Sequence, residues 1–134
     1  MKPTCAPLTQ AALLRRRCLS AVRHHRQRAR ADGVALPYGL EDLVRLAGGA
    51  TSCAYCGRPV GWDVQFDHSR PTARGGAHAL GNLAPACPRC NALKGQLDAG
   101  EFAELLALLA RLHPAAAQDL ERRLLAGGVR YRRR

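Results

Sequence analysis

Three side chains in the middle of the sequence have the types that hold a metal ion and activate a water. Asp67 and His68 are adjacent at the end of a segment that alternates like a strand, and Asn91 lies further along, beside a cysteine. Asp supplies a hard anionic oxygen and Asn a neutral one, which together suit a Mg²⁺ ion that also takes a substrate phosphate. His68 could accept a proton from an attacking water. Because strand side chains alternate between faces, the Asp-His pair can serve one ligand only if the chain distorts there; the alternative is an ordinary strand terminus.

Two C-x2-C pairs flank these residues and predict what brings them together. Cys53 and Cys56 lie in a knuckle, and Cys87 and Cys90 lie on the first turn of a predicted helix. Zinc prefers four tetrahedral ligands, and each pair presents two thiolates to one ion. A closed four-cysteine site is structural, so Zn²⁺ would hold the fold and the chemistry would belong to the residues drawn together. Two disulfides are the alternative, which an oxidising compartment would favour.

Residues 53–95 resemble an HNH endonuclease of the four-cysteine, ββα-metal type. The features that carry the resemblance occur in order: C-x2-C, Asp-His, a Gly-Gly loop, Asn-Leu, then C-x2-C-Asn and Lys-Gly. The resemblance implies that Asp67 and Asn91 are ligands of a catalytic metal and that His68 is the general base. It also implies that Asn82 uses its amide to tie the loop and orient the backbone of His68. Many family members carry His where this chain has Asn91, so the resemblance is to an H-N-N variant.

The chemistry that this resemblance implies is hydrolysis of a DNA phosphodiester. Water deprotonated by His68 would attack in line, with one Mg²⁺ or Mn²⁺ stabilising the charge that develops on the phosphate. The products expected of the family are a 5′-phosphate and a 3′-hydroxyl. The alternative is a non-catalytic, zinc-stabilised module that binds nucleic acid or serves as an adaptor. A third hypothesis keeps the nuclease and places it in a dimer or a larger nuclease assembly.

The charge distribution predicts a polyanionic partner. The net charge is +11, yet residues 36–112 hold seven basic and seven acidic residues. Residues 1–35 hold eight Lys/Arg and one acid, and residues 113–134 hold six and two. A neutral centre between basic arms favours nucleic acid, here double-stranded DNA, over charge that serves only solubility. The residues predicted to contact it are Arg70, Arg74 and Lys94 near the motif and, on the first helix, Arg15, Arg16, Arg23, Arg26 and Arg30; a solvated charged face is the alternative for the helix.

Helical periodicity flanks a short pair of strands. The pattern predicts two N-terminal helices, over 9–31 and 39–47. It predicts one strand over 62–68, with Trp62, Val64 and Phe66 on one side, and a second strand over 82–86. Three further helices are predicted: one that begins at Pro88, one that begins at a capping box of Asp98 and Glu101, and one over 115–126. The expected fold class is α+β, a small zinc-stapled ββα-metal core with flanking α-helices. The predicted organisation is a basic N-terminal helical arm over 1–35, the HNH domain with its leading helix over 36–97, and C-terminal helices with a basic tail over 98–134.

The apolar runs of the sequence are short. None has the length that a secretory signal or a membrane span requires, so no membrane partner is expected. The expected location is therefore the cytoplasm, where reduced thiols favour zinc over disulfides.

Overall fold

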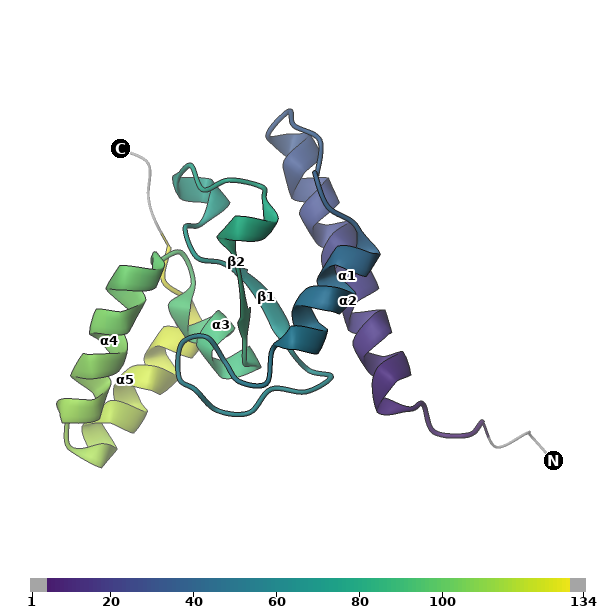
Figure 1. The fold of residues 1–134 in the computed structure, drawn as a ribbon. Coiled ribbons are helices and arrows are strands. Elements are labelled where there is room, and N and C mark those ends of the chain that lie inside the picture. The colour runs from purple at the N-terminus through teal and green to yellow at the C-terminus, as the bar shows by residue number, and fades with distance from the viewer. Residues whose placement is uncertain (1–4, 131–134) are drawn as a thin grey trace.

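The computed structural model describes residues 5–130, and its fold is α+β, as predicted. In chain order the elements are α1 (Gln10–Ala31), α2 (Leu40–Gly49), β1 (Gln65–His68), the 3-10 helices η1 (Thr72–Arg74) and η2 (Leu80–Asn82), β2 (Leu83–Ala86), α3 (Pro88–Lys94), α4 (Ala99–Arg111) and α5 (Pro114–Gly127). The sheet stands between α1 and α2 on one side and α3, α4 and α5 on the other (Figure 1). The predicted basic tail at 131–134 lies outside the described residues.

The sheet is shorter than the alternating sequence predicts. The chain turns at residues 61–64, where the amide of Val64 donates to the carbonyl of Gly61 (3.1 Å), so β1 begins only after this turn. Trp62 lies in the turn and is 42% exposed, whereas Val64 and Phe66 are buried, so the predicted placement of all three on one side of a strand is wrong. The remaining strand pairs antiparallel with β2, and its last two residues are the Asp-His pair.

The long basic helix predicted over 9–31 is confirmed as α1. The hydroxyl of Thr9 accepts a hydrogen bond from the amide of Ala12 (3.1 Å) and caps its first turn. Cys18 and Val22 recur at helical spacing and are buried against α2 and the sheet. Among residues 5–130, neither α1 nor any other helix is long and apolar enough to cross a bilayer.

The opposite layer is built on a capped helix. Asp98 Oδ1 accepts from the amide of Glu101, and Glu101 Oε1 accepts from the amide of Asp98, both at 2.9 Å. The predicted capping box is therefore present and starts α4. Phe102, in the first turns of α4, is fully buried among the cysteines. Arg89 of α3 pairs with Glu121 of α5 (Nη2 to Oε2 2.8 Å), so α5 is tied to the same layer.

Candidate functional site

The four cysteines of the two pairs meet in one cluster. The Sγ atoms of Cys53, Cys56, Cys87 and Cys90 lie within 4.8 Å of one another, and those of Cys56 and Cys87 are 3.8 Å apart. Four sulfurs at about 2.3 Å from a zinc ion stand about 3.8 Å from each other, so the cluster has the size of a tetrahedral zinc site. The amides of Tyr55 and Cys90 donate to two of the sulfurs, both at 3.4 Å. Within residues 5–130 every cysteine is unpaired, so no disulfide replaces the cluster.

The cluster also fixes the start of α3, which places Asn91 beside the end of β1. Cys87 caps α3 and Pro88 takes its first helical position, as predicted. Asp67, His68 and Asn91 all line one open cavity of about 710 Å³. The three groups with metal-binding and proton-accepting chemistry therefore share a single cavity.

Asp67 is buried and held by two donors. The hydroxyl of Tyr55 donates to its Oδ2 at 2.5 Å, and Nζ of Lys94 lies 2.9 Å from the same oxygen. Burial raises the pKa of Asp67, and these two donors oppose the rise. Both donors contact Oδ2, and neither contacts Oδ1. Oδ1 is therefore the oxygen that a cation in the cavity would use.

His68 is held neutral by its surroundings. Burial lowers the pKa of His68 to about 4, with a further contribution from the positive groups around it. Its ring lies 4.8 Å from the ring of His25 and 6.0 Å from that of His78, measured between centroids. The Nε2 atom of His68 is buried and has no hydrogen-bond partner in the part of the chain that the structure describes. A neutral imidazole of this kind can accept a proton near neutral pH.

Lys94 lies inside the site and not on its surface. Its side chain is fully buried, and Nζ donates to the backbone carbonyl of His68 (2.9 Å) as well as pairing with Asp67. The sequence places Lys94 among the phosphate contacts, but a fully buried ammonium is out of reach of a nucleic acid. Instead, Lys94 ties α3 to the end of β1, because a buried charge needs such partners.

Asn82 spans the loop between the two strands. Its Nδ2 donates to the carbonyls of Arg70 and Ala77, both at 2.9 Å, and its Oδ1 accepts from the amide of Arg70 (3.0 Å). Its backbone carbonyl accepts from the amide of Ser69 (2.8 Å). The amide side chain thus ties the loop, as the resemblance implies, and it reaches the backbone of His68 only through the neighbouring loop residues.

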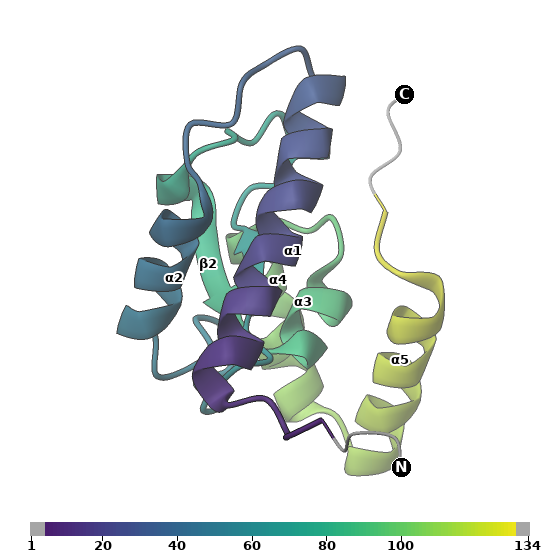
Figure 2. The same cartoon turned by 90° about the vertical axis from the view of Figure 1, so that its right-hand side faces the viewer.

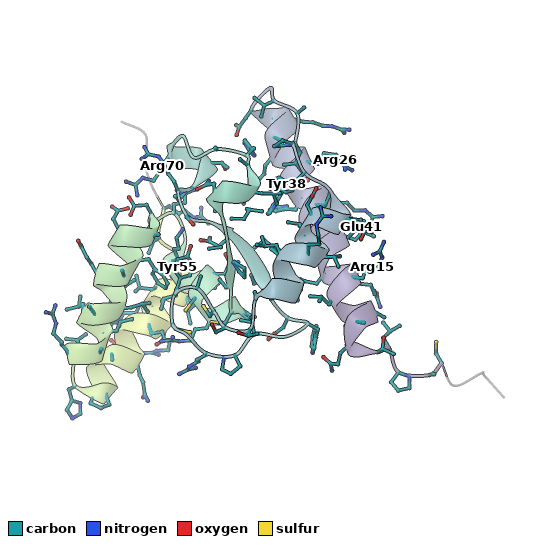
Figure 3. The ribbon with its side chains drawn as sticks, viewed as in Figure 1. Arg15, Arg26, Tyr38, Glu41, Tyr55 and Arg70 are labelled. Atoms are coloured by element: carbon teal, nitrogen blue, oxygen red, sulfur yellow. The ribbon has the colours of Figure 1, made fainter. Side chains whose placement is uncertain are left out.

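The two arginines of this loop differ in exposure. Arg70 is exposed at the loop surface, visible in Figure 3, and its Nε donates to the carbonyl of Arg74 (3.2 Å). Arg74 is half-buried, pairs with Glu101 and donates to the carbonyl of Gln96 (3.3 Å). Arg74 therefore braces the loop against the start of α4, and Arg70 is the better placed of the two for a phosphate.

The arginines predicted to contact nucleic acid from α1 lie away from the cavity. Arg15 pairs with Glu41 of α2 (2.6 Å), and Figure 3 shows this pair on the side of the molecule that carries α2. Arg16 is exposed, and three others gather on the outer face of α1: Arg23, Arg26 and Arg30. None of these five arginines lines the cavity that holds His68.

The structure adds residues of α1 that the sequence pattern did not single out. Nδ1 of His25 lies 2.7 Å from the hydroxyl of Tyr38, and its ring packs on His68. Arg17 and Arg28 line the cavity itself. The helical pattern does place Arg17 and Arg28 on one face beside the buried stripe of α1, but more arginines lie on the other flank, so the pattern favours that flank for contact with nucleic acid.

A family model matches the middle of the chain. The model of the HNH endonuclease family matches residues 53–97, which contain the cysteine cluster, both strands and α3. No curated protein matches the chain. Residues 53–97 are therefore an HNH endonuclease domain, which indicates nuclease activity on a nucleic acid, with four cysteines positioned to bind a zinc ion.

Proposed function

We propose that the chain is a metal-dependent endonuclease that hydrolyses phosphodiester bonds of double-stranded DNA. The observation that carries the proposal is the single cavity lined by Asp67, His68 and Asn91 within the HNH domain. Hydrolysis of this kind needs a base and metal ligands within reach of one phosphate, and a shared cavity supports the proposal that these residues act together.

The donor set of the cavity suits Mg²⁺ or Mn²⁺. Asp67 offers the carboxylate oxygen Oδ1, and Asn91, whose side chain has no hydrogen-bond partner among the described residues, offers an amide oxygen. Magnesium is commonly held by one or two such ligands and keeps the rest of its shell for waters and a substrate phosphate. Bound there, the ion would neutralise the negative charge that develops on the phosphate and on the departing 3′ oxygen.

His68 is proposed as the general base, with two neighbours that position it. Burial keeps its imidazole neutral, so that a ring nitrogen can take the proton of the attacking water. Lys94 holds the backbone carbonyl of His68, and Asn82 holds the loop that follows it. Neither of these two residues needs to touch the phosphate.

The proposed products follow from one active site per chain. One such site cuts one strand at a time, so a monomer is expected to nick DNA and leave a 5′-phosphate and a 3′-hydroxyl. A double-strand break would need a second copy, in a dimer or a larger nuclease assembly. Arg70 on the loop and the basic residues of both ends of the chain are proposed to supply phosphate contacts.

The test is cleavage of supercoiled plasmid by the zinc-loaded full chain in Mg²⁺ or Mn²⁺, with no added Mg²⁺ or Mn²⁺ as the blank. His68→Ala is compared with His113→Ala, which replaces an exposed histidine at the start of α5, outside the cavity. We expect nicking by the wild type and by His113→Ala, and none by His68→Ala or without added Mg²⁺ or Mn²⁺. Tight DNA binding without cleavage in any divalent metal would instead support the non-catalytic module, and cleavage of RNA alone would change the substrate.

A further inference from the structure

Helix α1 has a second charged face, which borders the cavity of His68. We call Arg17, His24 and Arg28 the inner row of α1. They follow one another at intervals of seven and four residues, which places them on one side of the helix. All three line the cavity, whereas the arginines of the outer face do not.

The inner row forms one wall of an open groove. Asp67, His68 and Asn91 belong to the same cavity, and residues 128–130, which follow α5, line it as well. The carbonyl of Val129 accepts from the amide of Gln96, just beyond α3 (2.8 Å), which fixes this segment in place. In Figure 2, α1 runs on one side and the segment after α5 on the other, with α3 between them.

The length of the inner row matches a stretch of nucleic-acid strand. Arg17 and Arg28 are eleven residues apart in sequence, which corresponds to about 16 Å along a helix with a rise of about 1.5 Å per residue. A strand of duplex DNA carries one phosphate per about 3.4 Å of axis, so the row spans about five phosphates.

The charge of the inner row is not neutralised within the fold. The structure gives Arg17 and Arg28 no ion pair with any residue of 5–130. The described acids that line the cavity are Asp32, which is hydrogen-bonded to His78 (2.7 Å), and Asp67, which is paired with buried Lys94. Both acids have partners of their own, so they do not neutralise Arg17 and Arg28. The groove therefore presents these two guanidinium groups to a ligand.

Arg28 is the member of the inner row whose charge acts on the base. Burial is the main cause that lowers the pKa of His68, and the positive charge of Arg28 contributes to the same shift. Arg28 lines the same cavity as His68, and the planar fork of a guanidinium suits bidentate contact with a phosphate bound there.

We propose that the inner row binds the phosphates of the DNA strand that is cut, with Arg28 next to the reacting phosphate and Arg17 further along the strand. The inference rests on the proposed function and adds residues outside the HNH domain to its active site. Residues 1–35, predicted as a separate basic arm, then supply one wall of the groove.

The test measures DNA binding by two double variants of the full, zinc-loaded chain, each in the His68→Ala background so that the DNA stays intact. One carries Arg17→Gln and Arg28→Gln, and the matched control carries Arg23→Gln and Arg30→Gln on the outer face. Binding of a short labelled duplex is followed between about 50 and 200 mM salt. We expect the inner pair to lower the slope of log K against log salt by about 1.8, or about 0.9 for each phosphate that the protein no longer neutralises, and the outer pair by less than half of that.

Equal reductions of the slope in the two double variants, or a larger reduction in the outer pair, would overturn the inference, because α1 would then act as a general polycation. Arg17→Lys with Arg28→Lys keeps both charges and is expected to restore most of the slope; failure of this rescue would also count against phosphate binding. Cleavage by the wild type is scored separately. If the inner pair lowers the slope more than the outer pair but the wild type cuts no DNA, the proposed function fails and the inference about the inner row stands. If the wild type cuts DNA but the two double variants have equal slopes, the inference fails and the proposed function stands.

Discussion

Replacing Lys94 by Met tests how the interior of the site is held. The side chain of Lys94 is 0% exposed and that of Asp67 is 9% exposed, with Nζ and Oδ2 2.9 Å apart. Without the ammonium, Asp67 keeps a buried carboxylate with one donor, Tyr55, and the carbonyl of His68 loses its donor. Removing one partner of a buried ion pair costs about 3–5 kcal/mol, and Met keeps the apolar stem, so nearly all of the loss is electrostatic. Such a loss is a large part of the about 5–15 kcal/mol that stabilises a typical domain.

The measurement is the free energy of unfolding in urea at a fixed, saturating zinc concentration. Arg45→Met is the matched control, because Arg45 also pairs with an aspartate, Asp42 (2.7 Å), but is 76% exposed, and an exposed pair contributes about 1 kcal/mol or less. Adding Asp67→Asn to Lys94→Met is expected to recover part of the loss, since it removes the carboxylate charge that was left unpaired. If Lys94→Met costs no more than Arg45→Met, the reasoning about the buried pair is refuted.

Three further changes test the cluster, the loop and the buried histidine. Cys90→Ser is expected to lose the bound zinc and most of the folding free energy that zinc binding supplies, on the order of 10 kcal/mol. The control Cys5→Ser, at an exposed cysteine, is expected to keep one zinc per chain. Equal zinc contents of the two variants by elemental analysis would argue against the cluster. Gly76→Ala would place a Cβ 1.8 Å from a backbone carbonyl oxygen and is expected to lower the melting temperature, whereas Gly81→Ala meets nothing within 4 Å; equal melting temperatures would contradict this packing. Burial lowers the pKa of His25 from 6.5 to about 4, so the unfolded chain takes up the proton first, and the free energy of unfolding falls as the pH drops from 6.5 to about 4. The free energy of unfolding, measured at a series of pH values, is expected to fall less steeply for His25→Gln than for the wild type. Parallel curves for the two proteins would be the contrary result.

The parts of the fold that could be predicted are those that neighbours in sequence determine. Pro88 opens α3 and Asp98 begins a capping box, because each of these signals acts within one helical turn. The two C-x2-C pairs predicted the cysteine cluster for a related reason: each pair is local, and zinc chemistry supplies the link between the pairs.

The parts that could not be predicted depend on how elements pack against one another. Trp62 continues the alternation of β1, but the chain turns there and the strand begins later. Lys94 looks like a surface residue of a short helix until Asp67 from β1 is placed against it. A helical pattern shows that Arg17 and Arg28 share a face, but only the docking of α1 on the sheet shows that this face meets the cavity.

The most direct test of the account is a pair of measurements on one variant, His68→Ala. Single-turnover cleavage of a labelled duplex in Mg²⁺ reports the chemical step, and the dissociation constant for the same duplex, measured with the zinc-loaded protein and no added Mg²⁺, reports binding alone. General-base catalysis contributes about 10²–10⁴ in rate, so we expect His68→Ala to lose at least about 10² in cleavage with an unchanged dissociation constant. Cleavage within about tenfold of the wild-type rate would contradict the role of His68, and with it the proposed active site.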